Sequence, residues 1–140
     1  MKKHISIVLL IIWMIIIFLM SNSSAVESSN QSGLITTLIN RILMLENFEF
    51  LDFIIRKSAH LFEYIVLGIL MINCFKNYNI KNYFLLAIIL CFIYACTDEI
   101  HQVFIPGRSG KVQDVLLDTL GSIVGVVSYY SISKRSKNKI

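Results

Sequence analysis

The chain contains little proline, glycine or cysteine for its 140 residues. One proline and six glycines exclude a collagen-like or other low-complexity chain. The three cysteines lie inside apolar runs at irregular spacing, so they indicate neither a disulfide framework nor a pair of zinc ligands. Only 16% of the residues are charged, whereas 56% are hydrophobic and the mean hydropathy is +0.69. This composition predicts a membrane protein rather than a soluble globular domain.

Four apolar runs approach the roughly 20 residues that a membrane-spanning helix needs. They cover about residues 5–20, 58–75, 83–105 and 112–132. A short basic turn separates the second run from the third, and a loop marked by Pro106 and two glycines separates the third from the fourth. We therefore predict an all-α integral membrane protein, with a single domain over residues 1–140 that forms a four-transmembrane-helix bundle.

The first run and the segment after it allow alternative interpretations. Two lysines precede the run and residues 23–25 resemble a cleavage site, so the run is either a signal peptide or, as its length favours, an uncleaved spanning helix. Residues 21–33 have the composition of a loop. Apolar residues recur at helical spacing over residues 34–45, which predicts a short amphipathic helix, either on the outer membrane interface or packed on the bundle.

The distribution of charge predicts how the helices are oriented. With both termini in the cytoplasm, eight of the thirteen Lys and Arg residues lie on the cytoplasmic side, and all nine acidic residues lie in outer loops or outer halves of the spans. This arrangement satisfies the positive-inside rule. The net charge of +4 therefore reflects membrane topology, and no nucleic-acid partner is expected because no basic stripe with interleaved aromatic residues is present.

Acidic and histidine side chains lie inside the predicted spans, where an ionised group at mid-depth costs about 2.5–3.5 kcal/mol on insertion scales. The rise per residue of a helix places the acidic and histidine side chains of three spans in one layer, about 10 Å below the outer surface. By helical spacing, one stripe contains Arg56, His60 and Glu63. A second stripe contains Asp98 and His101, with Glu99 turned aside, and a third contains Asp114 and Asp118. We predict one outward-facing polar site containing His60, Glu63, Asp98, Glu99, His101, Asp114 and Asp118.

The histidines and acids of this site fit two kinds of catalytic chemistry. His60-x-x-Glu63 and Asp98-x-x-His101 provide imidazole and carboxylate donors that suit zinc or manganese. These four residues are the candidate ligands of a divalent metal. Together with Glu99 they can instead act as general acids and bases. Neither a serine–histidine nucleophile nor a phosphate-cradling glycine loop occurs in the sequence.

Neighbouring cationic and polar side chains indicate an anionic ligand. Arg108, on a loop flanked by glycines above the polar layer, is placed to bind a phosphate or carboxylate through two parallel hydrogen bonds. The predicted substrate-binding residues are Arg56, Lys57, Gln102, Arg108, Asp114 and Asp118. The competing interpretation is a structural salt-bridge network in which the two arginines neutralise the buried acids. Tyr64 is either a donor to this site or, as we favour, an interfacial aromatic residue.

The last span adds a packing motif below its acids. Gly121 continues the stripe of Asp114 and Asp118, and Gly121 and Gly125 form a small-xxx-small pattern. Such a pattern lets two membrane helices approach closely. We therefore expect a close helix contact beneath the charged layer.

Three stretches of this sequence resemble the VanZ-like family of small bacterial membrane proteins. They are Arg-Lys-Ser-Ala-His-Leu-Phe-Glu-Tyr at residues 56–64, Tyr-Ala-Cys-Thr-Asp-Glu-Ile-His-Gln-Val-Phe-Ile-Pro-Gly-Arg at residues 94–108, and Asp-Val-Leu-Leu-Asp-Thr-Leu-Gly at residues 114–121. The resemblance covers nearly the whole chain. Asp118 departs from the family pattern, in which Asn often precedes the Thr-x-Gly of the last helix.

The resemblance implies a role at the outer leaflet of the bacterial cell membrane, such as low-level resistance to teicoplanin, a lipid-tailed glycopeptide antibiotic. One hypothesis is a non-enzymatic envelope protein that limits binding of the glycopeptide. The alternative is a membrane-embedded, metal-dependent hydrolase or transferase that acts on a lipid or cell-wall intermediate. Membrane lipids or a lipid-linked envelope precursor are the expected partners. A transporter ranks third, because the four spans contain no detectable inverted repeat.

Overall fold

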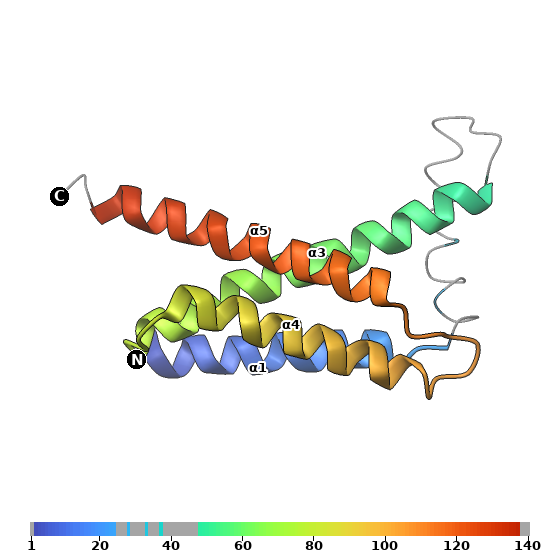
Figure 1. Ribbon diagram of the computed structural model, residues 1–140, viewed down its shortest axis with the longest axis horizontal. Helices are drawn as coiled ribbons and strands as arrows, with labels where there is room; N and C mark the ends of the chain where they lie inside the picture. The colour runs from blue at the N-terminus through green and yellow to red at the C-terminus, as the bar shows by residue number, and fades with distance from the viewer. Residues whose placement is uncertain (1, 25–27, 29–32, 34–36, 38–47, 138–140) are drawn as a thin grey trace.

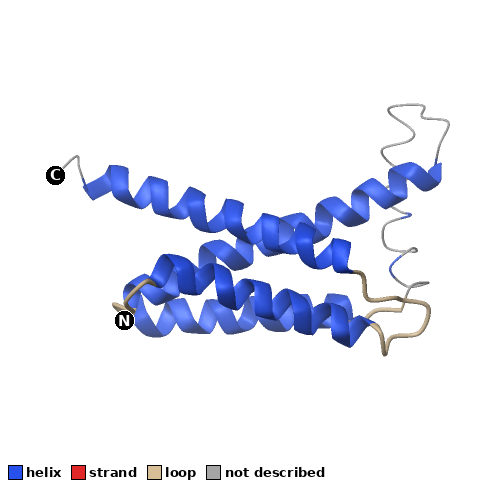
Figure 2. Cartoon of the chain, in the orientation of Figure 1, coloured by secondary structure: helices blue, strands red, loops and turns tan. Residues whose placement is uncertain are grey.

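The computed structural model describes residues 2–24, 28, 33, 37 and 48–137. This part of the chain is all-α and contains no strand, and its long helices are joined by loops and turns (Figure 2). The helices are α1 (Lys2–Ser21), α3 (Phe48–Asn77), α4 (Tyr83–Gln102) and α5 (Val112–Lys137). Each contains a stretch long and apolar enough to cross a membrane. The prediction of an all-α protein with four such helices is confirmed.

The helix boundaries differ most from the predicted spans at three points. α5 continues to Lys137 rather than ending near residue 132. α3 begins at Phe48 rather than near residue 58, since the polar segment before the span continues the helix. Asp52 and Arg56, one turn apart, form an ion pair at 3.2 Å that stabilises these extra turns. α4 ends at Gln102 rather than near residue 105, because tight turns follow and Gly107 takes the left-handed conformation at φ 75°.

The bundle is built around the crossing of α3 and α5, which Figure 1 shows. α3 packs most extensively against α5, and α4 contacts both of them. α1 lies against α3 and α4, and both described termini lie at the same end of the bundle, as Figure 1 shows. The predicted amphipathic helix over residues 34–45 falls, apart from Thr37, outside the described residues.

Glycines allow α3 and α5 to cross at close range. A Cβ atom built on Gly68 of α3 would lie 2.3 Å from the carbonyl oxygen of Ser122, and one built on Gly125 of α5 would lie 2.1 Å from that of Ile65. A Cβ on Gly121 would lie 2.7 Å from a carbonyl oxygen of α3. The predicted close contact at Gly121 and Gly125 is confirmed, and Gly68 is its counterpart on α3.

Two hydrogen bonds hold α1 in the bundle. The indole Nε1 of Trp13 donates to the carbonyl oxygen of Glu63 at 3.0 Å. The hydroxyl of Tyr94 on α4 donates to the carbonyl oxygen of Met14 at 2.7 Å. Because a buried indole or phenol needs a partner, these bonds connect the middle of α1 to α3 and to α4.

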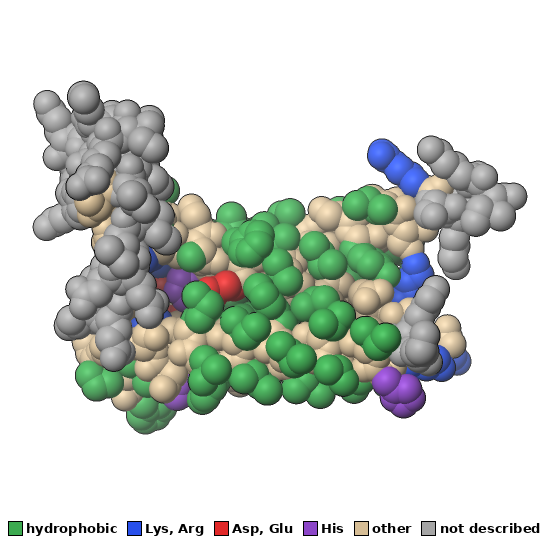
Figure 3. All heavy atoms as spheres, turned by 180° about the vertical axis from the view of Figure 1, so that it is seen from behind, with side chains coloured by type: hydrophobic (Ala, Val, Ile, Leu, Met, Phe, Trp, Pro, Cys, Tyr) green, Lys and Arg blue, Asp and Glu red, His purple; other side chains and the backbone are tan. Residues whose placement is uncertain are grey.

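The outer surface of the bundle is largely apolar. Figure 3 shows hydrophobic side chains over its middle, Lys and Arg at the end with the termini, and acidic and histidine side chains in a hollow toward the other end. Large side chains such as Ile15, Leu85 and Leu120 are about half exposed, at 51%, 57% and 58%. A surface of this kind on four long apolar helices is that of a multi-pass membrane protein.

Candidate functional site

A polar pocket opens at the end of the bundle opposite the termini. Its volume is about 170 Å³, and its walls come from the first turns of α3, the loop after α4 and the start of α5. The cationic side chains that line it are Arg56, Lys57, Arg108 and Lys111. His60 also lines the pocket and lies between it and the protein interior.

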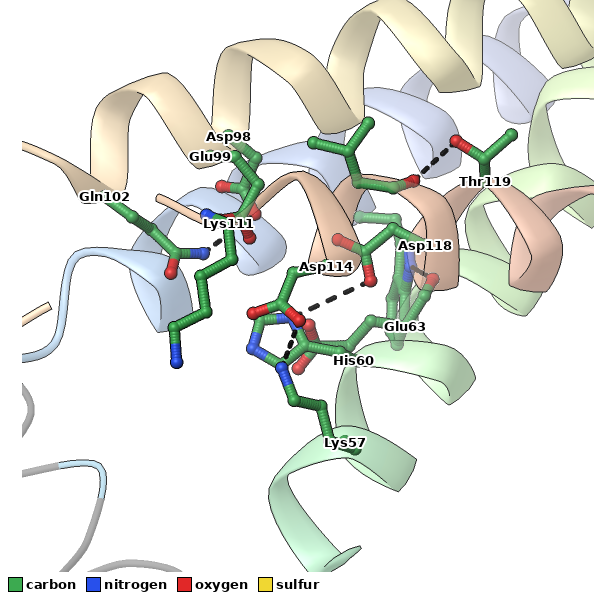
Figure 4. Close-up of polar contacts among 12 residues, drawn as sticks. Lys57, His60, Glu63, Asp98, Glu99, Gln102, Lys111, Asp114, Asp118 and Thr119 are labelled. Atoms are coloured by element: carbon green, nitrogen blue, oxygen red, sulfur yellow. Dashed lines mark hydrogen bonds and ion pairs between the residues drawn. The ribbon is translucent and has the colours of Figure 1, made fainter. Parts of the chain in front are cut away.

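Beside the pocket, three side chains from three helices converge. His60 of α3, Asp98 of α4 and Asp118 of α5 each offer one donor atom, and these three atoms all lie within 4.8 Å of one another. Asp98 is 6% exposed and Asp118 is fully buried. Figure 4 shows Asp118 and His60 pointing toward one another between α5 and α3. We call these three residues the buried triad.

Asp118 lies in the triad without a hydrogen bond. Both of its carboxylate oxygens are buried, and neither has a hydrogen-bond partner among the described residues. The Nδ1 atom of His60, which is 4.0 Å from the Oδ1 atom of Asp118, is buried and equally unpartnered within that part of the chain. An unpaired ionised carboxylate in a protein interior costs several kcal/mol. A proton on the carboxylate, a protonated His60 or a bound cation would offset this cost.

Glu99 and Gln102 hold the surroundings of the triad in place. The Oε2 atom of Glu99 accepts a hydrogen bond at 2.8 Å from the backbone N–H of Lys111, directly before α5 begins. The carboxylate thus connects the end of α4 to a helix N-terminus, where negative charge is favoured. The Nε2 atom of Gln102 donates to the Oδ2 atom of Asp98 at 3.4 Å and orients that carboxylate.

Two of the four cations that line the pocket pair with acids near it. Lys57 contacts the carboxylate of Asp114, and Arg56 pairs with Asp52 at 3.2 Å. Arg108 forms no ion pair with any acid in the described ranges. Within those ranges no arginine pairs with a buried acid. The salt-bridge network that the sequence suggested, with Arg56 and Arg108 neutralising the buried acids, is therefore not the arrangement observed.

His101 does not join the triad. Its Nε2 atom lies 3.3 Å from the Oδ1 atom of Asn22, and its ring packs against Phe18 with centroids 4.8 Å apart. The structure therefore does not bring His101 and Asp98, which the sequence assigned to one site, into the same cluster. Three residues turn a helix by about 300°, which puts His101 about 60° to one side of Asp98, and α1 covers that side.

Glu63 lies near the triad without joining it, and Tyr64 differs from its predicted place. Glu63 is buried, one turn beyond His60 on α3, but its carboxylate lies outside the triad. Among the described residues, Asp118 therefore takes the position beside His60 that the sequence assigned to Glu63. Tyr64 is fully buried, so it is not an interfacial aromatic residue, and its hydroxyl has no hydrogen-bond partner in the described segments.

Sequence reasoning missed two residues that shape the site. Asp52 pairs with Arg56, and its spacing of four residues on a helix was a detectable signal. Trp13 was overlooked as a packing residue, although a single indole inside an apolar run predicts an acceptor on a neighbouring helix.

Comparison with known families gives one finding. The family model described as VanZ/LLP1 matches residues 6–133, which is nearly the whole chain. No curated protein and no solved structure matches the chain. The matched region includes the pocket and all three residues of the buried triad.

Proposed function

The chain belongs to the VanZ/LLP1 family, and we propose that it is a bacterial cell-membrane protein whose pocket binds an anionic head group. The ligand would be the phosphate-bearing head of a membrane lipid or of a lipid-linked envelope precursor. The observation that supports this proposal best is the cationic pocket at one end of four apolar helices.

Arg108 is the side chain best suited to receive such a head group. It lines the pocket and makes no ion pair with the described residues, so its guanidinium is available for two parallel hydrogen bonds to phosphate. The volume of about 170 Å³ is below the 300–1,000 Å³ typical of sites for drug-sized ligands. A head group fits this space, while the acyl chains of a lipid would lie along the apolar helices.

The distribution of charge supports an outward-facing pocket. Lys and Arg side chains gather at the opposite end, beside the termini (Figure 3). Residues 2–21, 64–97 and 119–137, which contain the described part of that end, include no Asp or Glu. Segments rich in Lys and Arg remain in the cytoplasm, so the pocket would face the exterior.

Lipid binding by purified protein tests the proposal. The probes are phosphatidylglycerol and phosphatidylcholine, whose retention is compared by native mass spectrometry. Arg108→Gln is expected to lose at least about tenfold in affinity for phosphatidylglycerol, since a hydrogen bond to a charged group contributes about 1.5–3 kcal/mol. Lys134→Gln, at the opposite end, is the matched control. Equal losses in both variants would mean nonspecific attraction and would refute the pocket as the binding site.

A contribution to low-level teicoplanin resistance is the finer part of this proposal, and it derives from the family resemblance. Wild type and Arg108→Gln would be expressed at equal levels in a susceptible bacterium. Wild type is expected to raise the inhibitory concentration of teicoplanin, and the variant is expected to raise it less. An identical increase with both proteins would show that resistance does not depend on the pocket.

A membrane-embedded hydrolase or transferase is the second candidate, and the unpartnered groups of the buried triad favour it. His60 and Asp118 would exchange protons with, or hold an ion for, a substrate whose head group lies in the pocket. Lipid and precursor profiles by mass spectrometry should then change with wild type and not with Asp118→Asn. Indistinguishable profiles would leave only the binding role.

A further inference from the structure

We infer that His60, Asp98 and Asp118 bind a divalent transition-metal ion, zinc or manganese, beside the pocket. The inference deepens the proposed function and rests on it for the ion's role toward a head group. The binding of the ion itself depends only on the triad. Metal binding and lipid binding are measured separately, so that either can fail alone.

The donor set of the triad suits such ions. One imidazole nitrogen and two carboxylates from three helices supply three protein ligands, the number that catalytic zinc sites use, with one position left for water or substrate. Manganese accepts the same donors. Calcium takes six to eight oxygen ligands, and magnesium prefers water and carboxylate oxygens, so neither is matched to this set.

The distances in the triad are close to those of a metal site. Two ligands held 2.0–2.2 Å from zinc at a tetrahedral angle lie about 3.4 Å apart. The Nδ1 atom of His60 and the Oδ1 atom of Asp118 are 4.0 Å apart, and all three donor atoms fall within 4.8 Å. A contraction of about 1 Å, within reach of side-chain rotation, would complete the coordination without moving a helix.

The burial of Asp118 without a hydrogen-bond partner among the described residues independently supports a metal ion at this place. Asp118 is fully buried and both of its oxygens are unpartnered among the described residues, although two cations line the nearby pocket wall on α3. Lys57 contacts Asp114 instead, and Arg56 pairs with Asp52. A metal ion would supply the missing positive charge. The hydrogen bond from Gln102 to Asp98 is the kind of outer contact that orients a ligating carboxylate.

The ion would act in the pocket as well as in the interior. His60 belongs to both the triad and the pocket wall, so an ion held by the triad would lie next to the pocket. A phosphate oxygen bound there would be polarised by the ion, while Arg108 binds another oxygen of the same group. This arrangement specifies the proposed ligand as a phosphate or phosphate ester.

The experiment measures the metal alone. Wild type with a histidine-free tag is purified without chelators from cells supplied with zinc and manganese, and its metal is counted by mass spectrometry of the elements. We expect about one ion per chain. After stripping with chelator, added Zn²⁺ or Mn²⁺ should raise the unfolding temperature. Asp118→Asn should bind the ion more than about 100-fold more weakly, since loss even of outer contacts typically costs 10–100-fold.

Two controls keep the result interpretable. Asp52→Asn makes the same change at a rim acid outside the triad and should keep the wild-type ion. Asp118→Asn is isosteric and removes an unpaired charge, so the stripped variant should unfold at or above the temperature of stripped wild type. Wild type without a bound ion or a metal-dependent shift would overturn the inference, and so would an Asp118→Asn variant that binds the ion normally. Ion binding without phosphatidylglycerol binding would sustain it and refute the proposed function.

Discussion

A methyl group added at Gly125 tests the close crossing of α3 and α5. Its Cβ would lie 2.1 Å from the carbonyl oxygen of Ile65 and 3.0 Å from the carbonyl carbon. Ordinary contact begins at 3.4 Å, so the methyl group is about 1.3 Å too close. Both neighbours are backbone atoms, which no rotamer change can move aside. The two helices must therefore separate.

The expected cost follows from that separation. Overpacking a well-packed contact costs typically about 1–3 kcal/mol. A gap of 0.5–1 Å already loses a quarter to a half of the dispersion energy of each contact it opens. The gain in helix propensity from Gly to Ala, up to about 1 kcal/mol, offsets part of this. We expect Gly125→Ala to lower the free energy of unfolding by about 1–2 kcal/mol.

The assay is reversible unfolding in mixed micelles by added dodecyl sulfate, followed by the fluorescence of Trp13, which is the one tryptophan of the chain. Gly33→Ala is the matched control, because nothing lies within 4 Å of the position its Cβ would occupy. The control should stay within about 0.5 kcal/mol of wild type. If Gly125→Ala is as stable as the control, the backbones of α3 and α5 do not approach as described.

The remaining predictions concern the neighbours of this crossing and the topology. Trp13→Phe removes the donor to the Glu63 carbonyl and should cost about 0.6 kcal/mol, the average for interhelical hydrogen bonds in a membrane, as measured by circular dichroism during unfolding; an unchanged midpoint would contradict it. Glu99→Gln weakens the acceptor of the Lys111 N–H and should speed amide hydrogen exchange in the loop before α5, an effect of about 1 kcal/mol. Equal exchange in both proteins would count against that role. A fluorescent protein fused to the C-terminus should fluoresce, because we expect that end in the cytoplasm. Ser109→Cys should react with an impermeant maleimide added to intact cells. Labelling only after permeabilisation would show that the topology is the reverse of the one proposed.

The number and type of helices could be predicted because both depend on local sequence. An apolar run of sufficient length specifies a spanning helix whatever lies beside it. The start of α3 was missed because charged residues such as Asp52 and Arg56 interrupt the apolar pattern, whereas they pair along the helix and prolong it. The glycine pattern at Gly121 and Gly125 indicated a contact, but not that Gly68 would be its partner.

Only part of the site could be predicted. The position of a residue in the sequence gives the depth of its side chain in the membrane, but not which neighbouring helix the side chain faces. Helical rise placed His60, Asp98 and Asp118 in one layer, and the structure brings them together. Which neighbour covers each side of a helix depends on packing. On one side of α4, His101 contacts Phe18 of α1 and Asn22 directly after it, although His101 is only three residues from Asp98. Spacing along one helix could not reveal this.

The glycine crossing and the buried triad depend on each other. Because Gly121 and Gly125 bring α5 against α3, Asp118 is buried where no Lys or Arg of the described residues pairs with it. A proton, a protonated His60 or a small ion would neutralise it there. Asp118→Asn makes this position neutral, and it should lose the ion while keeping the part of head-group binding that depends on Arg108.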